Sequence, residues 1–336
     1  KQLGKVLAVL FACFCILASF GIGNMSQLNS IAGNMNAAFG VPTIVTGLAL
    51  MVVTALIVIG GLKRIASVSE KVIPVMVVIY VAFSIVLIVL NITALPDALA
   101  TIVQSAFGLR AAAGGALGAI IIAMQKGIAR GIFSNEAGLG SAPIAAAAAQ
   151  TKEPVRQGLV SMTGTFLDTI VVCSMTGLAL VMTGAYQIPG LEGAAVTTAA
   201  FQMGLPFIPA EAVSFVLMVC LALFGFTTIL GWDYYGERCL EYLSGGSKKA
   251  VKTYRWLYIL AVFIGPYMTV SAVWTIADIF NACMAIPNMI ALIVLSGVVV
   301  KETKDYFKRL NEAEGDEDNL APRDTSDDWK AEEATA

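Results

Sequence analysis

The chain contains no histidine among its 336 residues, and only 13% of its residues are charged. The absence of histidine removes the commonest metal ligand and the side chain that titrates closest to neutral pH. A soluble domain carries about 25% charged residues, whereas 58% of this chain is hydrophobic and its mean hydropathy is +0.81. The six cysteines lie in or beside apolar runs, without the paired spacing of a metal site. This composition predicts an integral membrane protein.

Recognisable enzyme chemistry is also missing from the sequence. It has no Ser-His-Asp set, no glycine-rich phosphate loop and no basic stripe for nucleic acid. We therefore expect a protein that is not an enzyme, does not bind nucleic acid and has the lipid bilayer as its surroundings. The sequence leaves the oligomeric state open.

Eight apolar segments are each long enough for a membrane-spanning helix, which needs about 20 residues. The fourth is too long for one straight span, so we expect one crossing with a break between Gly131 and Gly140. The predicted spans are residues 4–38, 41–60, 72–91, 111–149, 159–184, 212–234, 256–276 and 279–300.

Basic residues predict the orientation of these spans, because cytoplasmic loops carry an excess of Lys and Arg. If residue 1 is cytoplasmic, the outer loops hold only Arg110, and the remaining loop cations fall inside. Residues 301–336 then form a cytoplasmic tail with 12 acids and six bases. We expect this tail to be largely disordered, with a regulatory element as the alternative. The expected location is the plasma (inner) membrane, with multiple passes.

The segment 127–143 places Arg, Ser, Asn, Glu, glycines and a proline inside an apolar run. Polar groups at membrane depth are costly unless they face the protein interior or water. Broken transporter helices use glycine and proline to expose backbone groups. Ser134 or Asn135 can cap a restarted half-helix, whose N-terminal end attracts a carboxylate. Glu136 is then expected to point into the bundle, toward a cationic or amide partner.

Two further spans carry polar groups. In the first, Asn24 and Gln27 lie three residues apart and are expected to share a helix face. They line a site or serve as interhelical hydrogen-bond partners, and the sequence favours neither. In the sixth, Thr227 and Thr228 follow Phe224 and Gly225 and suit an oxygen-only cation shell. Alternatively, their hydroxyls bond back to the carbonyl one turn earlier.

One intramembrane acid is a functional candidate because of its depth. Asp168 lies about ten residues into the fifth span, near the middle of the membrane. It is also a candidate structural partner for Arg130 or Lys126, and the sequence alone does not choose between the two.

Several motifs together resemble the alanine or glycine:cation symporter family. The most specific is residues 131–143 (GIFSNEAGLGSAP), joined by 20–30, by 226–238 and by 285–299, so the resemblance extends over about residues 5–305. It implies an all-α membrane protein with a leucine-transporter-like bundle of two inverted five-helix repeats. Residues 1–92 are then a partial first repeat, and 111–300 a complete second repeat within the transmembrane domain 1–300. The first two helices of the first repeat are expected to be absent from this chain.

The resemblance also implies a function and roles for individual residues. The expected activity is Na⁺-coupled symport of alanine or glycine by alternating access. Gly131, Phe133, Ser134 and Asn135 are expected to bind the substrate together with Asn24 and Gln27. Phe224, Thr227 and Thr228 are expected to form half of a sodium site, and Glu136 and Asp168 to be intramembrane charges.

Three alternatives remain at the level of sequence. A proton-coupled transporter would use Asp168 as the carrier. A channel would need a continuous polar pore, whereas the polar groups here gather near one depth in a few spans. A structural membrane subunit would not explain the glycine-rich break.

Overall fold

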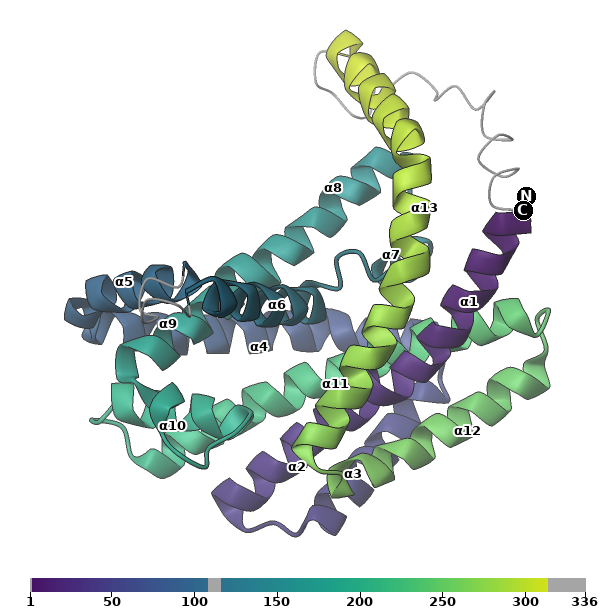
Figure 1. Cartoon of the computed structure of the whole chain (residues 1–336). Helices are drawn as coiled ribbons and strands as arrows, with labels where there is room; N and C mark the ends of the chain where they lie inside the picture. Colours follow the sequence, from purple (N-terminus) through teal and green to yellow (C-terminus); the bar gives the residue numbers. More distant parts are fainter. Residues whose placement is uncertain (1, 108–115, 314–336) are drawn as a thin grey trace.

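A computed structural model describes residues 2–107 and 116–313 of the chain, which are mostly helical and form no strand. The helices are arranged as an irregular bundle (Figure 1). Their bounds are α1 Gln2–Ala18, η1 Ser19–Met25, α2 Ser26–Phe39, α3 Thr43–Val58, α4 Leu62–Leu90, η2 Ile92–Ala94, α5 Leu95–Ala106, α6 Ala116–Asn135, α7 Ala142–Ala146, α8 Pro154–Thr165, η3 Phe166–Cys173, α9 Ser174–Thr183, η4 Ala185–Gln187, α10 Ala194–Gly204, α11 Ala210–Leu243, α12 Lys248–Ile264, η5 Gly265–Tyr267 and α13 Val270–Glu312.

Five continuous helical stretches in the described residues are long and apolar enough to cross a membrane. They are Gln2–Phe39, Leu62–Leu90, Pro154–Thr183, Ala210–Leu243 and Val270–Glu312. The prediction of an all-helical, multi-pass membrane protein is therefore confirmed. Helices α3, α6 and α12 occupy the other three predicted spans, and the total of eight spans and the inverted repeat stay predictions. Arg110, on which the predicted orientation depends, lies outside the described residues.

The boundary between the last two spans was predicted at the wrong place. We expected it near residues 277–278, but the chain turns at Gly265–Thr269, and α13 then runs from Val270 to Glu312. Pro266 and the cap on α13 explain this: the Thr269 hydroxyl accepts a hydrogen bond from the Ala272 N–H at 3.3 Å. The α5 and α10 helices were not predicted, because both are short.

Helix α13 also corrects the prediction for the tail. Its 43 residues correspond to about 65 Å at 1.5 Å per residue, longer than a bilayer core. Residues 301–312 are therefore helical, and α13 projects beyond the rest of the bundle (Figure 1). The buried Arg309 guanidinium donates to both carboxylate oxygens of Glu153, at 2.9 Å each, at the start of α8. The remainder of the predicted tail, 314–336, lies outside the described residues.

The centre of the bundle is formed where α1 packs against both α11 and α13 (Figure 1). Trp232 of α11 is 2% exposed and lies in the largest apolar cluster, with Ile22, Leu139 and Met284 around it. The chain between α1 and α2 is not broken but forms one π-helical turn, η1. At this turn Gly23 lies directly against Trp232.

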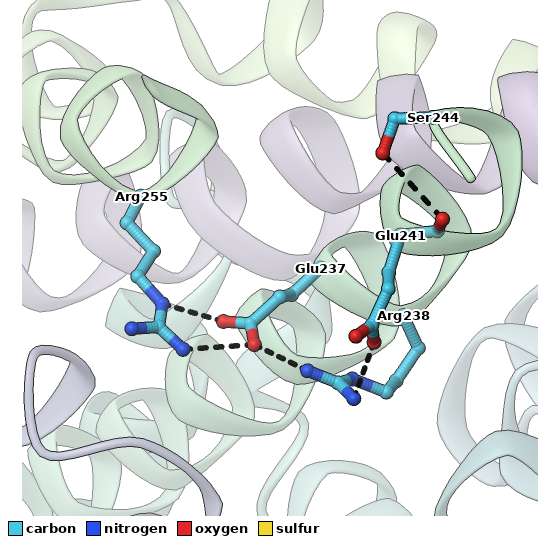
Figure 2. A network of polar contacts seen from close by, with 5 residues as sticks. All are labelled: Glu237, Arg238, Glu241, Ser244 and Arg255. Atoms are coloured by element: carbon cyan, nitrogen blue, oxygen red, sulfur yellow. Dashed lines mark hydrogen bonds and ion pairs between the residues drawn. The ribbon is translucent and has the colours of Figure 1, made fainter. Parts of the chain in front are cut away.

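An ion-pair network joins the ends of α11 and α12 (Figure 2). Glu237 accepts hydrogen bonds from Arg255 Nε at 2.6 Å and Nη2 at 2.8 Å, and from Arg238 Nη2 at 2.5 Å. Arg238 also pairs with Glu241 at 2.5 Å. The Glu237 side chain is only 7% exposed, so the guanidinium groups compensate a nearly buried carboxylate.

Candidate functional site

The polar segment predicted to break its helix does so, but later than expected. Helix α6 continues through Gly131 to Asn135, and the irregular stretch is Glu136–Ser141. Glu136 has a φ of 55°, and Gly138 and Gly140 have φ values of 82° and 90°. These left-handed conformations end the helix. The prediction that Gly131 lies in unwound backbone is therefore wrong.

The predicted half-helix also does not form as expected. Ser134 and Asn135 are the last residues of α6 and not the N-caps of a new helix. The chain resumes as α7, which has only five residues, too few for the expected N-terminal anion site. Ser and Asn beside glycines are ambiguous, because small polar residues serve both helix starts and helix ends. The tertiary contacts of the break decided which of the two applies.

Two helices hold the break in place. Asn288 of α13 donates from Nδ2 to the Gly138 carbonyl at 2.9 Å. Ser141 donates to Glu136 Oε2 at 2.6 Å, and the indole of Trp232 faces the same carboxylate. Glu136 therefore points into the bundle, as expected, but its partner in the break is a hydroxyl and not a cation or an amide.

Gly131 and Gly140 provide a matched pair of substitutions. An alanine Cβ at Gly140 would lie 2.7 Å from Phe11 Cε2 and 2.9 Å from Asn288, at a φ of 90°, whereas one at Gly131 would meet no atom within 4 Å. We expect Gly140→Ala to cost about 2 kcal/mol of stability and Gly131→Ala to leave the protein folded. Thermal unfolding of both variants in detergent tests this. Equal midpoints would contradict the geometry of the break.

The end of α6 contacts the π-helical turn η3. Ser134 donates through Oγ to Asp168 Oδ2, and Asn135 donates through Nδ2 to Thr169 Oγ1 at 3.1 Å. Asp168 therefore pairs with a hydroxyl, while Arg130 forms its ion pair with Asp278 of α13. The suggested Arg130–Asp168 pair is therefore wrong. The sequence could not exclude it, because it does not show which side of η3 Asp168 occupies.

Phe133 packs against an aromatic side chain that the sequence analysis did not select. Its ring centroid lies 4.7 Å from that of Trp274, and the Arg130 guanidinium lies 4.5 Å from the Trp274 ring centroid. No local signal identifies Trp274, because its partner lies on α6, far away in the sequence.

A cavity of about 340 Å³ connects several of these groups. Asp168, Trp274 and Phe224 contribute to its wall. Polar side chains from four other helices complete the wall, namely Ser30, Asn34, Tyr80, Thr176, Thr197 and Thr198. The Tyr80 hydroxyl lies 2.5 Å from Thr176 Oγ1. A tyrosine inside an otherwise apolar span was the one signal that could have identified this wall, since a buried Tyr O–H needs a partner.

Asn24 and Gln27 do not share a face. Asn24 is fully buried and donates from Nδ2 to the Tyr258 carbonyl of α12 at 3.0 Å, so it forms an interhelical hydrogen bond. Gln27 donates from Nε2 to the Ile22 carbonyl at 3.3 Å and lies beside Gly225 of α11. The π-helical turn between Ser19 and Met25 changes the angular spacing that the prediction assumed.

The hydroxyls of Thr227 and Thr228 in α11 bond to carbonyls one turn earlier in the same helix, which is the alternative to a cation site. Thr227 Oγ1 donates to the carbonyls of Leu223 and Phe224, at 3.0 Å each, and Thr228 Oγ1 donates to the Phe224 carbonyl at 2.9 Å. Their hydroxyl protons are thus used within the helix. The hydroxyl oxygens keep lone pairs, and three oxygen atoms gather around residue 224.

Comparison with known proteins identifies the family of the chain. The model of the sodium:alanine symporter family matches residues 1–320. An uncharacterized transporter of Haemophilus influenzae is 52% identical over 94% of this chain and 68% of its own length. The sodium/alanine symporter AgcS of Methanococcus maripaludis is 47% identical over 93% and 67%. The probable sodium/glutamine symporter GlnT of Bacillus subtilis is 41% identical over 92% and 62%.

These relatives are longer than the chain, which spans about two thirds of their length. Their names describe transporters and symporters, and none describes an enzyme. The resemblance in the motifs at 131–143 and 226–238 is confirmed by a match that covers nearly the whole chain. The chain belongs to the sodium:alanine symporter family of multi-pass membrane transport proteins.

Proposed function

We propose that this protein moves a small neutral amino acid, alanine foremost, together with Na⁺ by alternating access. The similarity to a sodium/alanine symporter at 47% identity supports alanine. A relative named for glutamine, at 41%, indicates that the family accepts more than one substrate. Glycine is the second candidate substrate, and only the motif resemblance supports it.

The observation that carries this proposal is the cavity beside the end of α6. Its volume of about 340 Å³ lies at the small end of ligand pockets, which span about 300–1,000 Å³. The cavity has one carboxylate, Asp168, and several hydroxyl and amide groups in a wall that also contains Trp274 and Phe224. This combination suits a zwitterion with a very small side chain.

The charge of the wall suggests how the substrate is oriented. The C-terminal end of α6 carries the negative end of the helix dipole, and Ser134 next to this end contacts Asp168. Both features favour the ammonium group of an amino acid. Phe133 and Trp274 then cover the side-chain end of the substrate. Gly131, Asn135 and Gln27 do not line this cavity, and the family resemblance alone supports them as substrate residues.

We assign the second-repeat half of the sodium site to Thr227, Thr228 and the Phe224 carbonyl. A hard monovalent cation prefers oxygen ligands, and the Thr227 and Thr228 hydroxyl oxygens lie 3.0 Å and 2.9 Å from the Phe224 carbonyl oxygen. The cation would use the hydroxyl lone pairs that back-bonding leaves available.

Changing both threonines to valine removes two oxygens at nearly constant shape. We expect the Na⁺ concentration for half-maximal alanine uptake to rise about tenfold or more, equivalent to about 1.4 kcal/mol of binding free energy. The measurement is labelled-alanine uptake into proteoliposomes that contain the purified protein. Thr183→Val is the matched control, because Thr183 also back-bonds, to Ala179 at 2.7 Å, away from this cluster. An unchanged Na⁺ dependence in the double variant would remove the assignment.

A proton-coupled transporter is the second candidate function, favoured by the Asp168 carboxylate in the cavity wall. Alanine uptake driven by an imposed proton gradient, with Na⁺ replaced by choline, separates the two. Sodium coupling predicts that a proton gradient alone drives little uptake, whereas proton coupling predicts full uptake that Asp168→Asn abolishes.

A further inference from the structure

A second polar site lies on the other side of α11 from the cavity, between α11, α12 and η1. Asp233 of α11 is 0% exposed, and neither of its carboxylate oxygens has a hydrogen-bond partner among the described residues. The Asn24 side chain of η1 is also 0% exposed, and its Oδ1 likewise lacks a partner there. The surrounding chain itself encloses both groups, so no further segment is needed to bury them.

Tyr258 connects the two groups. Asn24 donates to its carbonyl at 3.0 Å, and the Asp233 carboxylate interacts electrostatically with its phenol and with that of Tyr254. Gly23 packs closely on Trp232 and so brings η1 against α11. Asn24 directly follows Gly23 in the sequence, and Asp233 directly follows Trp232.

The hydroxyl protons near Asp233 are already used elsewhere. Tyr258 donates its O–H to the Ile229 carbonyl at 2.8 Å. Ser19 donates to the Ile16 carbonyl at 2.7 Å, so in the 2.8 Å contact between Ser19 and Tyr254 the tyrosine is the donor. Among the described residues, the region therefore holds several oxygen acceptors, and the hydroxyls of Ser19, Tyr254 and Tyr258 have acceptors other than the carboxylate.

The nearby arginine is also engaged. Arg255 interacts electrostatically with Asp233, but its Nε and Nη2 donate to Glu237, one turn further along α11 (Figure 2). A buried carboxylate without a donor is strongly disfavoured unless a positive charge compensates it. Acceptor oxygens that outnumber donors are the chemistry of a cation site.

We propose that Asp233 and Asn24 Oδ1 bind a monovalent cation of sodium size, at a site separate from Thr227 and Thr228. One carboxylate balances one positive charge, whereas a divalent ion would leave a buried net charge beside Arg255. The cation joins η1 to α11 and α12 and stabilises the scaffold behind the substrate cavity. The site is independent of which amino acid is transported.

Thermal unfolding of the purified protein in detergent tests the site without a transport assay. The midpoint is measured across a NaCl series at constant ionic strength with choline chloride, and again with KCl. We expect Na⁺ to raise the midpoint of the wild type, because a ligand that binds only the folded state stabilises it. The Thr227→Val/Thr228→Val variant should keep the part of this rise that comes from Asp233. Adding Asp233→Asn to that variant, which keeps the shape and removes the charge, should abolish the remaining rise.

Two control variants make the result specific. Asp97→Asn makes the same substitution at an exposed position of α5 and should keep the rise. The Thr227→Val/Thr228→Val variant should also keep the Asp233 part of it. If the rise is lost in the threonine variant and kept in Asp233→Asn, the proposed coupling-ion site is supported and the Asp233 site is overturned.

A second variant covers the case in which Asp233→Asn does not fold. Asn24→Ala removes one oxygen and leaves the carboxylate, so the Na⁺ concentration for half of the rise should increase about tenfold. A wild type that Na⁺ does not stabilise relative to choline, or an unchanged Na⁺ series in either variant, would overturn the proposal. In those cases Asp233 is compensated by a proton.

Discussion

Gly23→Ala is expected to abolish the folded protein. An alanine Cβ at this position would lie 2.1 Å from Trp232 Cβ and 2.2 Å from Trp232 Cγ. The Cβ atom of Trp232 cannot rotate away, because it is attached to the α11 backbone, so η1 and α11 would have to separate. Overpacking a core costs about 1–3 kcal/mol when side chains can adjust, and we expect about 3 kcal/mol or more here.

Gly33→Ala in α2 is the matched control, since its Cβ would meet no atom within 4 Å. Alanine is a better helix former than glycine by about 1 kcal/mol, so this variant should be as stable as the wild type or more so. The measurement is the unfolding midpoint and the folded fraction on gel filtration in detergent. If Gly23→Ala behaved like Gly33→Ala, the packing of η1 on α11 would be incorrect.

Glu237→Gln is expected to lower stability by about 3 kcal/mol, because removing one partner of a buried ion pair leaves the other charge uncompensated. Glu237 is 7% exposed and receives three hydrogen bonds from two arginines (Figure 2). A glutamine keeps the volume but directs an amide N–H₂ toward a guanidinium. The free energy of unfolding in urea, or the thermal midpoint, measures the loss.

Glu312→Gln is the control for the Glu237 experiment. Glu312 pairs with Lys308 at 3.9 Å, with side chains 62% and 75% exposed, so the change should cost less than about 0.5 kcal/mol. The double variant Glu237→Gln/Arg255→Gln should lose less than the sum of the two single changes. Equal losses in Glu237→Gln and Glu312→Gln would show that the network contributes nothing beyond an exposed pair.

Several features could be predicted because they depend on local composition alone. Long apolar runs determine a helical membrane protein, since the backbone must satisfy its own hydrogen bonds in lipid. The three glycines between 131 and 140 predicted a break in the helix, because glycine lowers helix stability by about 1 kcal/mol relative to alanine, and Gly138 and Gly140 lie in the observed break. The motif at 131–143 was specific enough to indicate the family.

Other features required the tertiary structure. The sequence contains Arg130, Asp168 and Asp278, but only the placement of α6, η3 and α13 shows that Arg130 pairs with Asp278. Likewise, the N-cap preference of Ser and Asn suggested that Ser134 or Asn135 starts a helix, whereas in the structure both residues end α6, beside a break held by Asn288.

The sequence by itself therefore determined that this chain is a helical membrane transport protein with a broken helix near Gly138. Periodicity and hydrophobicity are properties of neighbouring residues, which the sequence shows directly. Only the tertiary structure decided which polar groups meet: Asp168 meets Ser134 beside the cavity, and Asp233 meets no donor in the part of the chain that the structure describes. Such pairings depend on how helices distant in the sequence rotate and pack, as in the hydrogen bond from Asn24, in the π-helical stretch Ser19–Met25, to the Tyr258 carbonyl of α12.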